Sequence, residues 1–137
     1  MALIHLDAGV VIGFLDGSDV HHDAARALLA DALRAGDRLA MASSAFAECL
    51  VGPARQGDTA IRKVRELFDR LPISIVPLLA ETAVGAAQLR ARHPTLRLPD
   101  AIVIATAIQH AADHLATTDR RWPAARALRL KATLQYL

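Results

Sequence analysis

Short apolar runs alternate along the chain with longer segments in which apolar residues recur every three or four positions. The short runs, bounded by glycine, proline or charged residues, are typical of buried strands. They predict strands at residues 2–6, 39–41, 73–76, 115–118 and 128–130. The longer segments are typical of helices that bury one face. They predict a short helix after residue 7 and further helices over residues 18–35, 43–52, 58–71, 80–92 and 99–108.

Serine, aspartate and glycine residues set the expected ends of these helices. Side chains at 18–19, 43–44 and 58 are of the kind that accept hydrogen bonds from the first free N–H groups of a helix. Gly36 is expected to end one helix, because glycine readily adopts the left-handed conformation that follows a last turn. Gly52-Pro53 is expected to end or kink another.

The alternation of strands and helices predicts the class of fold. Right-handed crossovers join successive parallel strands, and helices then cover both faces of the sheet. We expect a three-layer α/β/α sandwich with a short, mostly parallel central sheet. The segment 99–108 is apolar almost all round, so it should form a central helix. No repeat or linker divides the 137 residues, which predicts one domain over residues 1–137.

Charge is distributed unevenly along the chain. The net charge is +2, but residues 1–60 carry 4 basic and 8 acidic groups, and residues 61–137 carry 12 basic and 6 acidic groups. Arginine accounts for 14 of the 16 basic residues, and its planar guanidinium can bind two phosphate oxygens at once. The basic half is compatible with a polyanionic partner.

Composition also bears on the compartment. Cys49 is the only cysteine and has no partner for an internal disulfide, which favours a reducing compartment. We expect it to be a small buried core residue and not a nucleophile. The first residues lack the basic and apolar regions of a signal peptide, and no stretch of about 18 residues is apolar enough to span a bilayer. The sequence therefore predicts a cytoplasmic protein with no membrane partner.

Four acidic residues from distant parts of the chain are predicted to meet. Asp7 follows the first strand, and Asp119 follows the strand at 115–118. Glu48 and Asp100 lie near the starts of two predicted helices. In parallel α/β proteins the carboxyl ends of strands form the rim where ligands bind. Taken singly, each acid could end a strand, begin a turn or favour a helix dipole, but their joint placement on one rim favours a site.

Carboxylates gathered in one cleft repel each other, which raises one or more of their pKa values. A hard divalent cation removes this repulsion, and oxygen ligands without histidine or cysteine favour Mg²⁺ or Mn²⁺ over Zn²⁺. Mg²⁺ keeps several waters and takes few protein ligands, which leaves room for a phosphate group. The chemistry that such a site predicts is metal-assisted hydrolysis of a phosphodiester.

Four segments carry a resemblance to the PIN-domain ribonucleases. Residues 6–16, Leu-Asp-Ala-Gly-Val-Val-Ile-Gly-Phe-Leu-Asp, resemble the opening motif, in which a strand ends in Asp before an apolar helix. Ser44-Ala-Phe-Ala-Glu48 resembles the second motif, and Leu98-Pro-Asp-Ala-Ile-Val-Ile-Ala-Thr-Ala107 resembles the third and most specific one. Leu115-Ala-Thr-Thr-Asp-Arg-Arg-Trp122 resembles the fourth, a Thr-x-Asp before an aromatic residue. Their order and spacing are similar to those of VapC-type toxins of bacterial toxin–antitoxin pairs.

The resemblance implies an endoribonuclease that depends on Mg²⁺ or Mn²⁺, forms a homodimer and is blocked by a small antitoxin protein. By position, it implies that Asp7, Glu48 and Asp100 are catalytic metal ligands and that Asp119 completes the acidic set. Thr117 matches a hydroxyl residue that hydrogen-bonds within the site, although an ordinary strand threonine is the alternative. An arginine from the antitoxin could neutralise the carboxylates.

One position departs from the family pattern. Many relatives carry Ser, Thr or Asn after the first Asp, whereas this chain has Ala8-Gly9. A side-chain hydrogen bond near the metal is then missing, and the Gly9 backbone N–H or a water could replace it. This departure leaves open a second function, that of a catalytically weak PIN fold serving as a binding module for nucleic acid or protein. The presence of all four acids argues against it.

Other patterns favour other classes of protein less well. His110 and His114 have a spacing that can bind zinc, but they lack the glutamate of an HExxH motif. His110 lies about 15 Å along the helix from Asp100, so these histidines cannot join the acidic site and we expect a structural role for them. A phosphotransfer receiver domain would show paired acids in its first loop, and an aspartyl phosphatase would show Asp-x-Asp, where this chain has glycine at position 9.

Two arginines and a tryptophan follow the last acid. Arg120 and Arg121 are candidates for contact with RNA phosphates, with exposed, solvated arginines as the alternative. Trp122 could stack on a base, but we expect it to pack in the core. The segment His21-His22-Asp23 is expected on a solvated face. No base-reading motif is visible, so the sequence does not name the RNA target.

Overall fold

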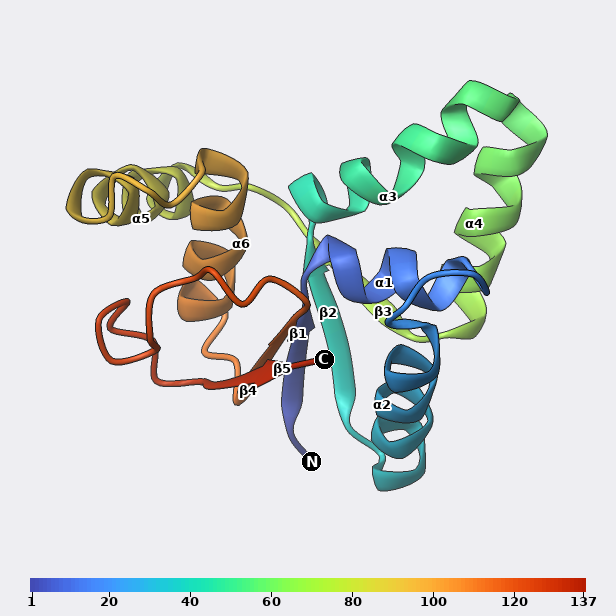
Figure 1. The fold of residues 1–137 in the computed structure, drawn as a ribbon, viewed down its shortest axis with the longest axis horizontal. Helices are drawn as coiled ribbons and strands as arrows, with labels where there is room; N and C mark the ends of the chain where they lie inside the picture. The colour runs from blue at the N-terminus through green and yellow to red at the C-terminus, as the bar shows by residue number, and fades with distance from the viewer.

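The computed structural model describes residues 1–137 and contains one five-stranded sheet. The strands are ordered β3-β2-β1-β4-β5, and every neighbouring pair is parallel. Their bounds are β1 Leu3–Leu6, β2 Arg38–Ala42, β3 Ile73–Val76, β4 His114–Thr117 and β5 Thr133–Tyr136. Because all strands run the same way, their carboxyl ends form a single rim (Figure 1).

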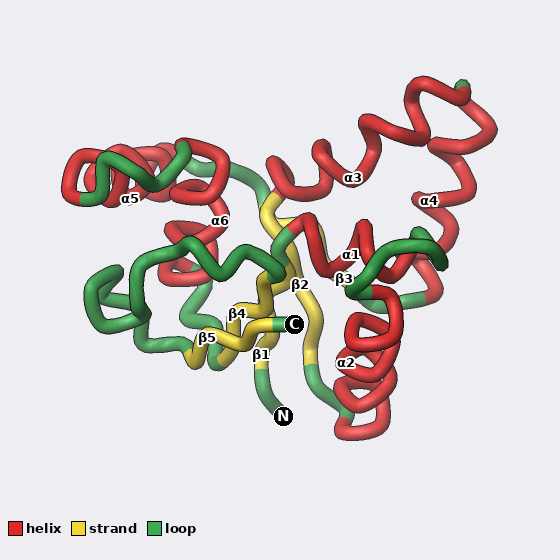
Figure 2. The backbone as a smooth tube through the Cα atoms, in the orientation of Figure 1, coloured by secondary structure: helices red, strands yellow, loops and turns green.

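Six helices surround this sheet. Their bounds are α1 Ala8–Leu15, α2 His22–Ala35, α3 Ser43–Gln56, α4 Asp58–Arg70, α5 Ala80–Arg92 and α6 Leu98–Gln109. Figures 1 and 2 show α5 and α6 on one side of the sheet and α1 and α2 on the other, with the α3–α4 hairpin extending beyond them. The predicted α/β/α sandwich is therefore confirmed, and its sheet is parallel throughout.

The core is aliphatic and lies on both faces of the central strands. All four residues of β1 are buried, and so are four of the five residues of β2. Helix α6 buries Ala101 and every residue from Val103 to Ala107, as expected for a helix that is apolar almost all round. Trp122 is buried against this core, as predicted.

The prediction of a last strand at 128–130 is wrong. Leu128 and Leu130 are buried on either side of exposed Arg129, which imitates the alternation of a strand. Arg129 has a φ of 55°, however, so the backbone turns there instead of extending. The final strand is β5, in which exposed and half-buried positions alternate along the edge of the sheet.

The predicted N-caps at 18–19 and 43–44 are also wrong. Helix α2 begins at His22, and Asp19 instead forms a turn in which its Oδ1 accepts from the His21 N–H at 2.8 Å. Helix α3 begins at Ser43 itself, after Ala42, and no side chain caps it.

Gly57 separates α3 from α4, a role that the sequence suggested for Gly52-Pro53. Helix α3 runs through Pro53, whose carbonyl still accepts from the Gly57 N–H at 3.1 Å. Gly57 has a φ of 115°, a conformation that glycine adopts far more easily than other residues. It also stands at the N-cap of α4, so Asp58 is the first residue of that helix and not its cap.

Candidate active site

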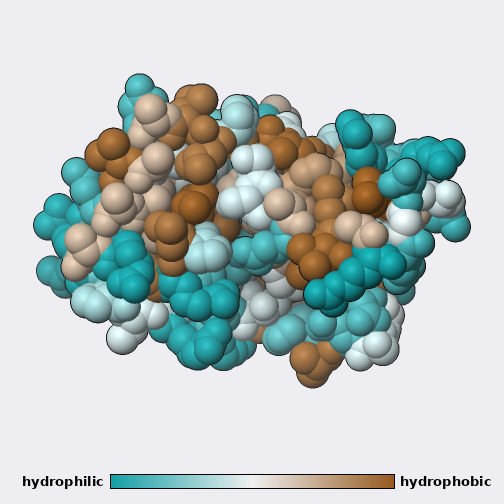
Figure 3. Space-filling view, turned by 90° about the horizontal axis from the view of Figure 1, so that it is seen from above, coloured by the Kyte–Doolittle hydropathy of each residue, from teal (hydrophilic) through white to brown (hydrophobic).

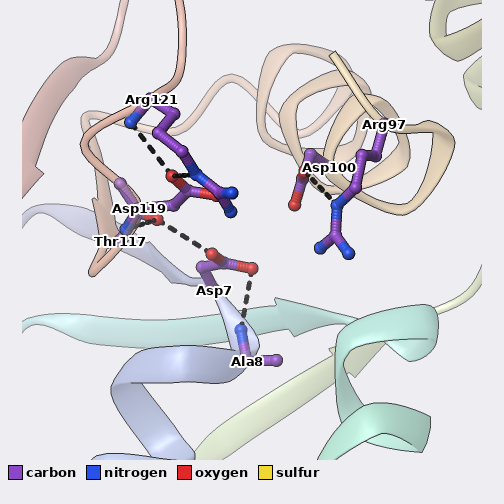
Figure 4. Close-up of polar contacts among 7 residues, drawn as sticks. All are labelled: Asp7, Ala8, Arg97, Asp100, Thr117, Asp119 and Arg121. Atoms are coloured by element: carbon purple, nitrogen blue, oxygen red, sulfur yellow. Dashed lines mark hydrogen bonds and ion pairs between the residues drawn. The ribbon is translucent and has the colours of Figure 1, made fainter. Parts of the chain in front are cut away.

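The candidate site lies at the carboxyl ends of β1 and β4. These neighbouring strands flank the point where the strand order reverses, since β2 and β3 lie to one side of β1, and β4 and β5 lie to the other. Ligand crevices in open parallel sheets form at such a switch point. Asp7 follows β1 directly, and Asp119 lies two residues after β4. The sheet thus places these two acids side by side, as the sequence predicted (Figure 4).

Asp7 is the most constrained of the acids. It is the N-cap of α1, and its Oδ1 accepts from the Ala8 N–H at 2.8 Å. Its Oδ2 accepts from the Thr117 hydroxyl at 2.8 Å. The residue is 8% exposed, and Thr117 is fully buried. Strand β4 therefore sets the orientation of the carboxylate that follows β1.

The electrostatic surroundings of Asp7 disfavour its charged form. Burial is the main cause that raises its pKa to about 6, and the charges of Asp100 and Glu48 add to the effect. The hydrogen bonds from Thr117 and Ala8 act in the opposite direction. The pKa of Glu48 is also raised, by burial and by Asp100. The charge of Asp100 therefore acts on both Asp7 and Glu48, which come from different parts of the chain.

Asp100 lies in the first turn of α6, where the helix dipole favours a negative charge. It is 8% exposed, and its Oδ2 accepts from Nε of Arg97 at 3.2 Å. Sequence reasoning missed Arg97. The signal was present, because a basic residue three positions before an acid at a helix start lies within reach of it.

Asp119, like Asp100, pairs with an arginine of its own segment, but this pair uses both carboxylate oxygens. Arg121 donates from Nε to Oδ1 and from Nη2 to Oδ2, each at 2.9 Å. This two-fold contact lowers the pKa of Asp119. The Asp119 N–H donates to the Thr117 hydroxyl at 3.0 Å, so Thr117 links Asp119 to Asp7.

Arg120 lies apart from this cluster. Its Nη2 donates to the Leu137 carbonyl at 3.4 Å, and its guanidinium carbon lies 5.6 Å from the centre of the Tyr136 ring. Of the two arginines that the sequence selected, only Arg121 contacts an acid of the site.

Gly9 is not simply a missing polar side chain, because Thr118 fills the adjacent space. A Cβ added at Gly9 would overlap the Thr118 hydroxyl oxygen. Thr118 lies between Thr117 and Asp119 and is half-buried. A hydroxyl group therefore does lie beside the first turn of α1, although it comes from the segment after β4.

We expect Gly9→Ala to destabilise the protein by about 1 kcal/mol, because Thr118 must move. Gly85→Ala is the matched control, since Gly85 is also helical, on α5, and a Cβ there meets only Ala105, at an ordinary contact distance of 3.6 Å. Gly85→Ala should stabilise the fold by about 0.5–1 kcal/mol. Urea unfolding measures both variants. Equal stabilisation by the two changes would show that Thr118 does not occupy this space.

The remaining candidates lie outside the site. His110 does not pair with His114 around a metal; its Nδ1 shares a hydrogen bond of 2.7 Å with Nε2 of His5, a buried strand residue. Cys49 is buried, and burial raises the pKa of its thiol to about 12, which makes it unreactive as a nucleophile. His22 was expected on a solvated face, but it is half-buried, and its Nδ1 lies 2.9 Å from the Gly13 carbonyl oxygen.

The donor chemistry of the site fits Mg²⁺ or Mn²⁺. All four acids supply oxygen, and a cation would offset the burial of charge at Asp7. No group of three or more His, Cys, Asp or Glu side chains lies close enough together to hold a metal ion. This is compatible with Mg²⁺, which binds through one or two carboxylates and keeps its waters. Asp100 and Asp119 are both turned toward arginines.

Comparison with known proteins identifies the family. Residues 4–128 match the PIN domain family, and the chain belongs to it. A chain of VapBC2 from Rickettsia felis, solved bound to a promoter DNA fragment, superposes with a TM-score of 0.76 at 16% identity, over 98% of each chain. The VapC20 toxin of Mycobacterium tuberculosis, which cleaves the Sarcin-Ricin loop, superposes with a TM-score of 0.70 at 18% identity, over 86% of this chain and 91% of that chain.

FitAcB from Neisseria gonorrhoeae shows the same fold, with a TM-score of 0.68 at 21% identity over 96% of each chain. No curated protein matches the sequence. None of the six helices has the length and apolar character needed to cross a membrane.

Proposed function

We propose that this protein is an endoribonuclease that depends on Mg²⁺ or Mn²⁺ and is the toxin of a toxin–antitoxin pair. The observation that carries the proposal is the buried Asp7 carboxylate, held by Thr117 and surrounded by the charges of Asp100 and Glu48. Burying a carboxylate that has no cationic partner next to other negative charges is costly for stability unless a cation joins them. The likeness to VapC20, a toxin that cleaves the Sarcin-Ricin loop, supports the same conclusion.

In this proposal each side chain has a distinct part. Asp7, Glu48 and Asp100 hold the cation, and Asp119 completes the negative charge of the site. The Thr117 hydroxyl donates to the Asp7 carboxylate and accepts from the Asp119 N–H, so it fixes the two residues relative to each other. When bound, the cation supplies activation of a water and neutralisation of charge on the phosphodiester.

The RNA strand is proposed to pass over the basic segment after β4. Arg121 contacts Asp119 at the site, and Arg120 lies against Tyr136 outside the acidic cluster. Both arginines are exposed, and we propose that the phosphate backbone passes over them. Exposed arginines of this kind contribute affinity without reading sequence.

We propose two protein partners, an antitoxin and a second copy of this chain. The similar solved structures include toxin–antitoxin complexes such as one from Klebsiella pneumoniae, and we propose that an antitoxin segment covers the acidic rim here in the cytoplasm.

We also propose a homodimer. Figure 3 shows apolar patches on both sides of a paler centre at the end of the molecule that carries α3 and α5. Leu79, Val84 and Leu98 are each more than half exposed, which is typical of an interaction surface.

RNA cleavage with and without metal tests the proposed activity. The protein should cleave single-stranded RNA with Mg²⁺ or Mn²⁺ and lose this activity in EDTA. Asp7→Asn and Asp100→Asn should abolish it, whereas Asp69→Asn, at an exposed position on α4, should not. Cleavage that persists in EDTA, or in both site variants, contradicts the metal mechanism. Metal-independent RNA binding without any cleavage would favour the binding-module alternative.

A further inference from the structure

Two exposed arginines each hold one carboxylate of the acidic site. Arg97 contacts Asp100, and Arg121 contacts both oxygens of Asp119. The arginine side chains are 66% and 83% exposed. Neither guanidinium donates a hydrogen bond to any group other than its acid. Figure 4 shows them on opposite sides of the space above Asp7.

We propose that Arg97 and Arg121 are exchangeable cations of this site. They pair with Asp100 and Asp119 while no metal is bound, and they turn to the backbone phosphates of RNA once a divalent cation takes these carboxylates. The inference rests on the proposed nuclease function and adds to it Arg97 as a further residue that binds the substrate backbone, and a competition between protein and metal cations.

The energetics allow this exchange. Each guanidinium is exposed, so water screens its pair with the carboxylate, and the long arginine side chain loses freedom in forming it. A divalent cation that contacts several carboxylates at once competes effectively with such a pair. The released guanidinium then stands beside the site with its planar set of donors free, and phosphate is the anion that it matches best.

The geometry favours these two arginines over their neighbour. Arg120 is retained by the Leu137 carbonyl and the Tyr136 ring, neither of which a metal would displace. In this arrangement no three of the four acids lie together as a group of ligands. Two of them are directed at arginines, and release of the arginines would let the carboxylates turn inward.

Titration of Mn²⁺ into the RNA-free protein by calorimetry tests the first half of the proposal. Arg97→Gln and Arg121→Gln should each bind Mn²⁺ about three- to ten-fold more tightly than the unmodified protein, because a competing cation is gone. Arg34→Gln is the matched control. Arg34 forms an ion pair with Asp31 at the same i,i+3 spacing on α2, and its removal should leave Mn²⁺ affinity unchanged.

RNA cleavage at saturating Mn²⁺ tests the second half. Each of the two site variants should raise KM for RNA several-fold, and it should reduce the dependence of log(kcat/KM) on log salt concentration by about 0.7, the value for one lost contact to a single strand. Arg34→Gln should change neither. Tighter Mn²⁺ binding with unchanged KM and salt dependence would overturn the exchange, because the arginines would then never reach RNA.

The same titration separates this inference from the proposed function. If the unmodified protein binds no Mn²⁺, the proposed function itself fails. If it binds Mn²⁺ but neither arginine variant binds more tightly, the exchange alone is overturned.

Discussion

Asp7→Asn should reduce metal-dependent RNA cleavage at least about a hundred-fold, a loss of about 2.7 kcal/mol of transition-state stabilisation. The side chain keeps its size and one of its oxygens, so Thr117 or the Ala8 N–H still has an acceptor. What disappears is the charge that would hold the cation. Initial rates on one RNA substrate, at one Mn²⁺ concentration that saturates the unmodified protein, measure the effect.

The same variant should be more stable than the natural protein in EDTA at pH 8. Folding raises the pKa of Asp7 from 3.8 to about 6, a shift that corresponds to about 3 kcal/mol. A raised carboxyl pKa stabilises the fold below pH 3.8, and this contribution is lost as the pH rises through 6. Asparagine avoids the loss but gives up one hydrogen bond, so we expect a net gain of about 2 kcal/mol. A variant that is inactive because it is unfolded would contradict this expectation.

His5 should make stability depend on pH in the opposite sense. Burial first, and the His110 charge second, lower its pKa from 6.5 to about 4. A lowered histidine pKa stabilises the fold above pH 6.5, and the contribution is lost as the pH falls through 4. Burial disfavours the charged ring because the Nδ1 of His5, which would carry a proton in that form, is buried without a hydrogen-bond partner.

Asp7 and His5 oppose each other between pH 4 and pH 6, so the natural protein should show a shallow profile there. In Asp7→Asn the opposing contribution of Asp7 is gone and only that of His5 remains. The free energy of unfolding of this variant should therefore fall by about 3 kcal/mol from pH 6.5 to pH 4. Chemical denaturation at several pH values in EDTA measures the profile. Titration of the His5 ring by NMR is an independent check. A His5 pKa near 6.5 would contradict the prediction, whatever the unfolding data show.

Local patterns predicted most of the fold, because its strands and helices are clearly punctuated. Helix α5 and strand β3 have the predicted bounds, and α6 is central because it has no polar face. Predictions failed where backbone dihedral angles decide the structure. The alternation of Leu128, Arg129 and Leu130 matches a strand, and only the positive φ of Arg129 shows otherwise.

The positions of Asp7, Asp100 and Asp119 at one rim followed from strand and helix order alone. Their partners were harder to foresee, because they depend on side-chain packing between segments that are far apart. The hydroxyl of Thr118 beside Gly9 comes from the segment after another strand, and the contact between His5 and His110 joins residues 105 positions apart. Arg97 is different, since its helical spacing to Asp100 was visible in the sequence.

Crystals grown with MnCl₂ would show, through the anomalous scattering of manganese, whether the acidic site binds a divalent cation. We expect a peak at the carboxyl ends of β1 and β4, about 2.0–2.3 Å from carboxylate oxygens of Asp7 and Asp100. The peak should be absent from crystals of Asp7→Asn grown in the same way. Manganese bound only elsewhere, or no peak in a protein that cleaves RNA in the same solution, would contradict a metal-dependent acidic site.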